Sequence, residues 1–256
     1  MEEFVILVDG NDNPIGKEEK VKCHLPNGKL HRAFTALIFN KEGKLLLTRR
    51  SDSKMLWPGD WDGTVASHPR EGETYVSSAE RRMPEEIGIE CEMNYVNKFE
   101  YHVPYKDVGS ENEVCGTLMG VVDDFDESSL IKDEISAIKW ISPEELNAEL
   151  ENNRDIYCPW MVIALYYLDD CESETKTKFS SLISEWTKEG LKQNYEKAIK
   201  INPNYFVAYN NIGFAFYECG DYQMAINKYK KAIEINPEYT RAYCNIGLAF
   251  EKTEEI

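Results

Sequence analysis

A segment near the end of the chain occurs twice, at a spacing of 34 residues. The first copy is YEKAIKINPNYFVAYNNIGFAF at 195–216, and the second is YKKAIEINPEYTRAYCNIGLAF at 229–250. A repeat of this length accommodates one pair of packed helices, and each pair needs neighbours because it cannot bury its apolar face alone. The repeat therefore restricts the last part of the chain to stacked helices.

This repeat resembles the tetratricopeptide repeat, a helix-turn-helix unit of the same period. We expect a small all-α helical-repeat region over 191–256. About one and a half repeats are present, whereas about three are usual for an array that is stable alone. The helices therefore need support from the preceding domain or from another chain. Packing or self-association is one interpretation of the repeat, and recruitment of a protein partner is the other.

The preceding residues alternate strand and helix patterns, which predict an α/β domain over 1–170. AFTALIF and LLLTRR flank the turn NKEG as a hairpin, and VCGTLMGVV and AIKWI are apolar enough for further strands. Ser142 and Glu145 predict a capping box at the start of a helix. The polar stretch ESETKTK at 172–178 suits a linker, so a linker and a lead-in helix are expected over 171–190.

One helix is predicted over 76–87, in VSSAERRMPEEI. Its apolar residues share one face and are Val76, Ala79, Met83 and Ile87. Gly88 suits the end of this helix. Pro84 opposes the pattern, because a proline inside a helix removes a backbone hydrogen bond at a cost of about 3 kcal/mol unless the helix ends nearby.

The formal net charge is −17, and the excess of acids lies in the first part of the chain. Residues 1–170 carry 34 acids and 18 bases, whereas 171–256 carry 12 acids and 11 bases. This balance argues against nucleic acid as a partner, because Lys and Arg contacts to phosphate dominate that binding. An anionic substrate would need a locally basic or metal-lined pocket.

The cysteines and the N-terminal sequence indicate a cytoplasmic protein. Seven cysteines without a CxxC pair suit reduced thiols better than a disulfide framework or a zinc knuckle. MEEFVILVDGNDNP lacks the basic start and long apolar core of a signal peptide. No run approaches the roughly 18 apolar residues of a membrane span, so no membrane span is expected.

Three histidines and two glutamates form a candidate metal site. His24 and His31 lie in KCHLPNGKLHRAF, where we expect them on two sides of a hairpin across the turn PNG. His68 follows in ASHP. In SENEVC, a strand would direct Glu111 and Glu113 to the same face. Imidazoles and carboxylates without an obligatory thiolate suit a divalent first-row ion or magnesium in a six-coordinate site.

Several separate motifs occur in the order known from one family. They are KCHLPNGKLHRAF, LLLTRRSDSKMLWPGDW, ASHP, GETYVSSAERRMPEEIGIE, FEY, ENEVC and CPWMV. From about residue 4 to 166 the chain resembles type I isopentenyl diphosphate isomerase, a member of the Nudix superfamily. The resemblance implies a Nudix-type α/β/α sandwich with a mixed sheet. It also implies interconversion of isopentenyl and dimethylallyl diphosphate in isoprenoid biosynthesis.

The resemblance also implies roles for individual residues. The ligands of a divalent ion (Mg²⁺, Mn²⁺ or Zn²⁺) would be His24, His31, His68, Glu111 and Glu113. Glu86 would hold a second ion, Mg²⁺, together with the diphosphate of the substrate. The phosphate-binding residues would be Lys20, Arg50, Lys54 and Arg82. Trp160 and Tyr101 would form an aromatic wall, which suits a developing carbocation.

Moving a double bond requires one proton to be added and another removed, so two acid–base groups are needed. Glu113, near Tyr101, is the candidate for one of them. The family's second group is a cysteine two residues before the third histidine, where this chain has Ala66. The substitutes open to it, none of them favoured, are Ser67, Cys115, or a water held by Thr64 or Ser67.

Two other functions compete with isomerisation. The Nudix helix motif aligns over 67–89, so hydrolysis of an isoprenoid or nucleotide diphosphate is the first. Against it, Ser67 stands where the motif has glycine, and Arg82 replaces the first glutamate of its REUxEE core. The second is a non-catalytic protein that binds an isoprenoid diphosphate while the repeat segment recruits a partner.

Overall fold

The computed structural model describes residues 3–122, 134–153, 156–168, 171, 173–186, 199, 203–204, 206–218 and 222–254. The chain divides into two compact units, 1–185 and 186–256, and each is described by itself. Among the described residues, no helix has the length and apolarity to cross a membrane. Six of the seven cysteines fall in this part of the chain and none of the six forms a disulfide bond, and Cys219 lies outside it.

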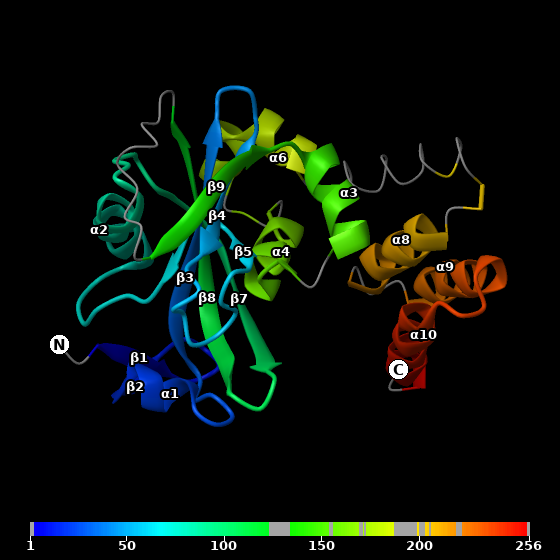
Figure 1. Ribbon diagram of the computed structural model, residues 1–256, viewed down its shortest axis with the longest axis horizontal. Coiled ribbons are helices and arrows are strands. Elements are labelled where there is room, and N and C mark those ends of the chain that lie inside the picture. The colour runs from blue at the N-terminus through cyan, green and yellow to red at the C-terminus, as the bar shows by residue number, and fades with distance from the viewer. Residues whose placement is uncertain are drawn as a thin grey trace. The chain divides into compact units, whose positions relative to one another are not determined.

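The first unit is built on one mixed sheet (Figure 1). The strands of the described residues are β1 (Phe4–Val8), β2 (Pro14–Glu19), β3 (His31–Asn40), β4 (Leu45–Arg50), β5 (Trp61–Asp62), β6 (Val65–Ser67), β7 (Asn94–Tyr105), β8 (Gly109–Val122) and β9 (Ile135–Ile141). Strand β3 lies at the centre. It pairs antiparallel with β1, β4 and β6 and parallel with β8. The predicted hairpin across NKEG is the β3–β4 pair, so that prediction is confirmed.

The helices of the first unit are α1 (Lys20–His24), α2 (Tyr75–Ile87), α3 (Pro143–Asn153), α4 (Pro159–Tyr166), α5 (Ser173–Lys178) and α6 (Ser180–Trp186). Helix α2 covers one face of the sheet and α4 the other (Figure 1). This is the α/β/α sandwich with a mixed sheet that the sequence predicts. The capping box before α3 is also confirmed, because Glu145 N–H donates to Ser142 Oγ at 3.2 Å and Ser142 N–H to Glu145 Oε2 at 2.8 Å.

Helix α2 follows the predicted pattern closely. Ala79, Met83 and Ile87 are buried against Phe34 of β3 and Leu118 of β8. Gly88 ends the helix in the left-handed conformation at φ 68°, where glycine is free of the steric cost of a Cβ. Pro84 is tolerated because it lies in the last turn, and its carbonyl accepts the N–H of Gly88 at 3.2 Å.

The alternation of side chains along β3 and β8 decides where the site forms. Phe34 of β3 and Leu118 of β8 point toward α2 and belong to the core. Neighbouring residues point to the opposite face, which α4 covers. The parallel ladder pairs His31 with Glu113, so a histidine and a carboxylate are neighbours on that face.

Residues of the expected linker are helical in the structure. Helix α5 contacts β7, and Thr175 Oγ1 donates to Tyr95 O at 2.9 Å. Helix α6 follows directly, and residues 187–190 of the expected lead-in helix lie outside the described part. The boundaries 1–170, 171–190 and 191–256 stay predictions.

The second unit contains three described helices, α8 (Phe206–Glu218), α9 (Tyr222–Ile235) and α10 (Thr240–Glu254). Their core includes Ala225, Ile226 and Tyr229 of α9 and Ala249 of α10. Asn245 Nδ2 of α10 donates to Asn210 Oδ1 of α8 at 3.0 Å. The helical character that the repeat predicts is therefore confirmed.

Candidate active site

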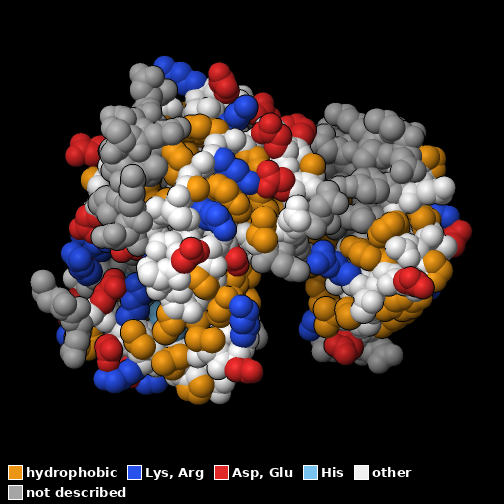
Figure 2. Space-filling view, in the orientation of Figure 1, with side chains coloured by type: hydrophobic (Ala, Val, Ile, Leu, Met, Phe, Trp, Pro, Cys, Tyr) orange, Lys and Arg blue, Asp and Glu red, His pale blue; other side chains and the backbone are white. Residues whose placement is uncertain are grey.

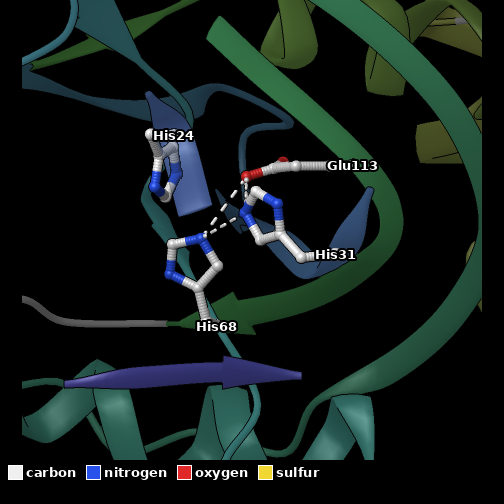
Figure 3. A group of neighbouring side chains, drawn as sticks. All are labelled: His24, His31, His68 and Glu113. Carbon is white, nitrogen blue, oxygen red and sulfur yellow. Dashed lines mark hydrogen bonds and ion pairs between the residues drawn. The ribbon is translucent and has the colours of Figure 1, made fainter. Parts of the chain in front are cut away.

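Three histidines converge at one end of the β3–β8 ladder. His24 is the last residue of α1, His31 the first of β3, and His68 follows β6. Figure 3 shows their rings and the carboxylate of Glu113 directed toward one another. One ligand atom from each of these four residues lies within 4.8 Å of the other three.

The expected hairpin between His24 and His31 is wrong. Residues 20–24 form the short helix α1, and the following loop is closed by Lys29 N–H, which donates to Cys23 O at 2.7 Å. The helix places His24 beside β3 instead of in a strand paired with it. The two imidazole centroids are nevertheless only 4.7 Å apart.

Two of the imidazoles are oriented by backbone carbonyl groups. His24 Nδ1 lies 2.6 Å from Lys20 O, and His31 Nδ1 lies 2.8 Å from Lys29 O. A carbonyl oxygen can only accept, so both Nδ1 atoms carry hydrogen and each neutral ring presents its Nε2 lone pair. Such bonds typically orient metal-binding histidines. His31 Nε2 lies 3.2 Å from His68 Nε2, which brings a second ring nitrogen to the same point.

Glu111 extends the cluster to the predicted five residues. Its Oε2 lies 2.8 Å from His24 Nε2, yet this buried oxygen makes no hydrogen bond among the described residues. A buried carboxylate oxygen without a hydrogen bond is costly unless a cation satisfies it. Three imidazoles and two carboxylates therefore fit a divalent metal ion.

The charges of the cluster suit a cation as well. Burial alone would raise the pKa of Glu113, but hydrogen bonds to His31 and Tyr101 lower it. Burial and the neighbouring Lys20, His31 and His24 lower the pKa of His68 well below its usual value. Burial opposes protonation of His31, but Cys23 and Glu113 raise its pKa, so a proton and a metal ion compete for this position.

Glu113 links the histidines to a tyrosine. Its Oε1 lies 3.4 Å from the Nε2 atoms of His31 and His68, and its Oε2 accepts the hydroxyl of Tyr101 at 2.5 Å. The pairing of β7 with β8 sets this contact, because Tyr101 and Glu113 are direct partners. Burial and the two glutamates raise the pKa of Tyr101 well above its usual value, so its hydroxyl keeps its proton.

A pocket of about 160 Å³ opens beside this cluster. The predicted site residues that line it are His24, His68, Glu111, Glu113, Tyr101, Trp160, Lys20, Arg50 and Lys54. His31 is fully buried behind them. The rings of Tyr101 and Trp160 lie 6.2 Å apart, and the Arg50 guanidinium lies 5.4 Å from the Trp160 ring. One pocket thus combines an aromatic wall, a fixed cation and the histidine cluster.

Asp62 holds two of these groups and was missed by sequence reasoning. This carboxylate is buried; its Oδ1 accepts Trp160 Nε1–H at 2.8 Å, and its Oδ2 accepts Arg50 Nη1–H at 3.0 Å. Backbone carbonyls of Leu56 and Trp57 accept two further hydrogen bonds from the guanidinium, at 3.1 Å each. A single acid that is 12 and 98 residues from its partners gives no spacing signal, so only the fold reveals its role.

A second, larger pocket adjoins the first. It has a volume of about 1290 Å³ and is lined by Arg82, Glu86 and Glu134. The two pockets share Lys20, Lys54, Ala66 and Ser67. Of the four expected diphosphate-binding residues, Lys20 and Lys54 therefore lie where the two pockets meet. Arg50 lines only the inner pocket, and Arg82 lines only the outer one.

Lys20, Lys54 and Arg82 are each paired with an acid. Lys20 Nζ lies 3.0 Å from Glu3, and Lys54 contacts Glu134. Arg82 lies 2.7 Å from Glu85 and also contacts Glu86, whose pKa is raised by burial although Arg82 opposes this.

Ala66 occupies the place of the family's thiol. It pairs with Thr35 across β6 and β3 and lines both pockets. Thr64, expected as a possible holder of water, is unsuitable because its buried hydroxyl donates to Leu46 O at 2.7 Å and accepts Ile38 N–H at 2.9 Å. Both bonds hold the strands together.

Cys115 and Ser67, the other residues that could replace the catalytic thiol, differ in their access to the pockets. Burial, Glu113, Asp62 and Glu111 raise the pKa of Cys115 well above its usual value, so this thiol is neutral. It is buried and does not line either pocket, whereas Ser67 lines both.

Comparison with known proteins agrees with this geometry. The NUDIX domain model matches residues 29–161, and two models, a TPR repeat and a tetratricopeptide repeat, match 215–253 and 194–227. The chain is 39% identical over 168 residues to an isopentenyl-diphosphate Delta-isomerase of Haloarcula marismortui, covering 63% of this chain and 88% of that protein.

Two further relatives extend the comparison. Isopentenyl-diphosphate Delta-isomerase 1 of Photorhabdus laumondii is 38% identical over 160 residues, covering 62% of this chain and 90% of that protein. The crystal structure of DR0079 from Deinococcus radiodurans has the same fold, with a TM-score of 0.53 and 23% identity over 63% of this chain and 97% of that one. The chain therefore belongs to the Nudix superfamily and, within it, to the isopentenyl-diphosphate Delta-isomerase family.

Proposed function

We propose that this chain interconverts isopentenyl and dimethylallyl diphosphate. The observation that carries the proposal is the hydrogen bond from Tyr101 to Glu113, 2.5 Å long, inside a pocket that Trp160 also lines. An acid–base pair beside an aromatic wall suits the movement of a double bond in a small hydrocarbon. The names of the relatives support the same reaction.

The reaction adds one proton to the terminal alkene carbon and removes another from the carbon on the far side of the branch. The electron pair of the first double bond forms the new C–H bond, and the electrons of the broken C–H bond form the new double bond. Positive charge develops on the branched carbon between these steps. The faces of the Trp160 and Tyr101 rings can stabilise that charge, by roughly 2 kcal/mol in a desolvated site.

We assign one proton transfer to Glu113 and Tyr101. The Tyr101 hydroxyl keeps its proton at neutral pH and donates a hydrogen bond to the Glu113 carboxylate, so the two side chains are joined by one exchangeable hydrogen. The buried histidines fix the other oxygen of Glu113. A divalent ion held by His24, His31, His68, Glu111 and Glu113 would supply positive charge that orients these carboxylates.

We assign the diphosphate to the junction of the two pockets, near Arg50, Lys54 and Lys20. Arg50 makes the most hydrogen bonds of the three, because Asp62 and two backbone carbonyls accept from its guanidinium. Lys20 and Lys54 would exchange their glutamate partners for phosphate oxygens. Glu86, with Mg²⁺, would hold the diphosphate from the second pocket, which Arg82 also lines.

The second proton transfer lacks its usual thiol. Ser67 and Tyr101 carry the hydroxyl groups among the described residues that line the inner pocket. A serine hydroxyl is much harder to ionise than a thiol with a pKa of about 8.5. We therefore propose that a water beside Ser67 exchanges the second proton, at a lower rate than a cysteine at position 66 would.

Hydrolysis of a diphosphate is the less favoured alternative. Arg82 contacts both Glu85 and Glu86, the carboxylates that a Nudix hydrolase would need for gathering cations. Its positive charge favours holding phosphate over collecting metal ions.

Nuclear magnetic resonance in D₂O distinguishes these functions. Purified chain with Mg²⁺ and Mn²⁺ or Zn²⁺ is incubated with isopentenyl diphosphate, and we expect dimethylallyl diphosphate that contains deuterium. Release of phosphate without isomerisation would identify a hydrolase. Tight binding without either product, in protein whose metal content is verified, would identify a binding protein and contradict the proposal.

A further inference from the structure

A row of uncharged polar side chains crosses the sheet beneath α4. Thr35 of β3 pairs with Thr117 of β8, which pairs in turn with Asn97 of β7. Residues that pair directly across strands point to the same face of a sheet. That face is the one covered by α4, because the side chains that alternate with the two threonines point toward α2. Asn97 has the same direction, since its Nδ2 donates to Tyr167 O at the end of α4.

Each member of the row has a polar atom without a hydrogen-bond partner. These atoms are Thr35 Oγ1, Thr117 Oγ1 and Asn97 Oδ1, all three buried and unbonded within the described part of the chain. Both threonines are fully buried. A buried hydroxyl or amide oxygen without a partner costs about 1–3 kcal/mol, so three in one row are unfavourable unless another molecule bonds to them. Bound water is the usual partner of such groups.

The spacing of the row suits single water molecules. Neighbouring strands lie about 4.8 Å apart, and a water with hydrogen bonds of about 2.8 Å on either side spans that step. A threonine hydroxyl both donates and accepts, and the Asn97 oxygen accepts, so each water finds at least two partners. Charged side chains are spread over the outside of the first unit (Figure 2), whereas the row is uncharged, which favours neutral water over an ion.

The two ends of the row lie near the pocket and near the surface. Thr35 pairs on its other side with Ala66, which lines both pockets. Because Ala66 takes the place of the family's thiol, the Thr35 hydroxyl lies one strand behind that position. At the opposite end of the row, Asn97 is partly exposed. The row therefore leads from the place of the missing thiol toward solvent.

We propose that Thr35, Thr117 and Asn97 bind a line of water molecules that ends beside Ala66 and supplies the second proton-transfer group of the reaction. This inference rests on the proposed isomerase function. The water beside Ala66 accepts a proton from the substrate carbon, and the electrons of the broken C–H bond form the new double bond. Each oxygen along the line then releases one proton as it accepts another, so the excess proton reaches solvent near Asn97. In the opposite direction of the reaction the same steps run in reverse.

A crystal structure of the native chain that resolves bound water tests the site without any reaction. We expect one water within hydrogen-bond distance of both Thr35 Oγ1 and Thr117 Oγ1, and another beside Ala66. Hydroxyl groups that bond to the backbone instead, with no water in the row, would overturn the proposal.

The role of Thr35 as a positioning residue is tested by removing its hydroxyl. Thr35→Val should slow isomerisation, measured by deuterium incorporation, at least about tenfold, because a misplaced acid–base group loses part of its usual 10²–10⁴-fold contribution. Thr35→Ser keeps the hydroxyl and should keep the native rate. Thr175→Val is the matched control: this buried threonine donates to Tyr95 O away from the row, so its loss should lower the melting temperature and leave the rate unchanged.

Ala66→Cys separates proton transfer from a purely structural role. With a thiol in place the water is no longer needed, so adding Thr35→Val to Ala66→Cys should change the rate less than about twofold. An equal loss in both backgrounds, or a native rate in Thr35→Val, would overturn the proposal. Isomerisation without water in the row would contradict this inference alone, whereas water in the row without isomerisation would contradict the proposed function and leave only the binding site.

Discussion

Strands β8 and β6 both pair with β3 and both line the inner pocket, but they contribute different chemistry. Strand β8 supplies Glu111 and Glu113, two buried carboxylates beside three histidines. Strand β6 supplies Ala66, whose methyl group can carry no proton, and Ser67. On the proposed mechanism, the β8 wall therefore carries metal ligands and one proton-transfer group, whereas the β6 wall carries no thiol.

If the proposed roles hold, binding and turnover depend on different parts of the pocket. On this proposal, the carboxylates of β8 and the three histidines would hold an ion, and Arg50, which Asp62 fixes, would help to hold the diphosphate. Only the second proton transfer depends on the wall that lacks a thiol. Changes on the β8 side should therefore have the largest effects, and changes away from both walls the smallest.

The largest loss is expected for Glu113→Gln. The amide keeps the size of the side chain and can still accept a hydrogen bond from Tyr101, but it removes the charge and cannot take up or release a proton. Isomerisation should fall about 10²–10⁴-fold, the usual contribution of a general acid or base. Deuterium incorporation measured by nuclear magnetic resonance checks this.

Metal content separates the two roles of Glu113. Tyr101→Phe should reduce turnover while the bound metal stays at the native level, because Tyr101 contacts the Glu113 oxygen that faces away from the histidines. Glu100→Gln, an exposed change on β7, is the matched control and should keep native activity. Native activity in Glu113→Gln would contradict the assignment.

The sequence predicted local structure better than the connections of the site. Helix α2 and the repeat helices have apolar residues at a regular period, and regular periods depend on neighbours in sequence. Helix α1 is only five residues long, too short to show a period, so His24 was expected in a strand. The short spacing of the SENEVC strand, by contrast, correctly placed Glu111 and Glu113 on one face.

Other features depend on contacts between distant segments. Asp62 gains its role from Arg50 and Trp160, which the fold brings to it. Thr64 has a hydroxyl group that could bind water, but within the sheet this hydroxyl already donates one hydrogen bond and accepts another. Such competition between a structural and a functional partner is invisible in a single sequence.

An intermediate effect is expected for Asp62→Asn, which tests how the substrate side of the pocket is held. Trp160 and Arg50 donate to different oxygens of Asp62, and asparagine would present its NH2 group to one of these two donors, which loses its partner at a cost of about 1–3 kcal/mol. The guanidinium and the indole should lose their fixed positions. KM for isopentenyl diphosphate should rise roughly tenfold, with a smaller change in kcat.

The control for Asp62 is the same change two residues earlier. Asp60→Asn alters a partly exposed carboxylate and should leave KM unchanged. A native KM in Asp62→Asn would show that Arg50 and Trp160 are positioned without this carboxylate. A uniform loss of kcat and folded protein would point to a purely structural role.

The smallest effect is expected outside both walls, at Glu73. Arg81 donates to its carboxylate at 2.6 and 2.9 Å and, by this hydrogen bonding, lowers the pKa of Glu73 from 4.5 to about 2. A lowered folded-state pKa stabilises the protein above pH 4.5, and the contribution is lost as the pH falls from there toward 2. Glu73→Gln should therefore lower the free energy of unfolding by about 1–2 kcal/mol at neutral pH.

Urea denaturation at several pH values measures this difference. The gap between Glu73→Gln and the native chain should narrow as the pH falls below 4.5. Glu71→Gln is the control, because its side chain is 86% exposed and its pair with Lys17 is 3.4 Å long. A gap that stays constant with pH would contradict a role for the Glu73 charge.

The most direct test of the difference between the two walls is Ala66→Cys, compared with the native chain by deuterium exchange at equal metal content. If β6 lacks one proton-transfer group, the new thiol should raise the rate of isomerisation at least about tenfold, and this gain should disappear when Glu113→Gln is added. Alkylation with iodoacetamide would verify that the thiol is accessible. An accessible thiol that leaves the native rate unchanged would contradict the account, because the wall formed by β6 would then lack nothing that the reaction needs.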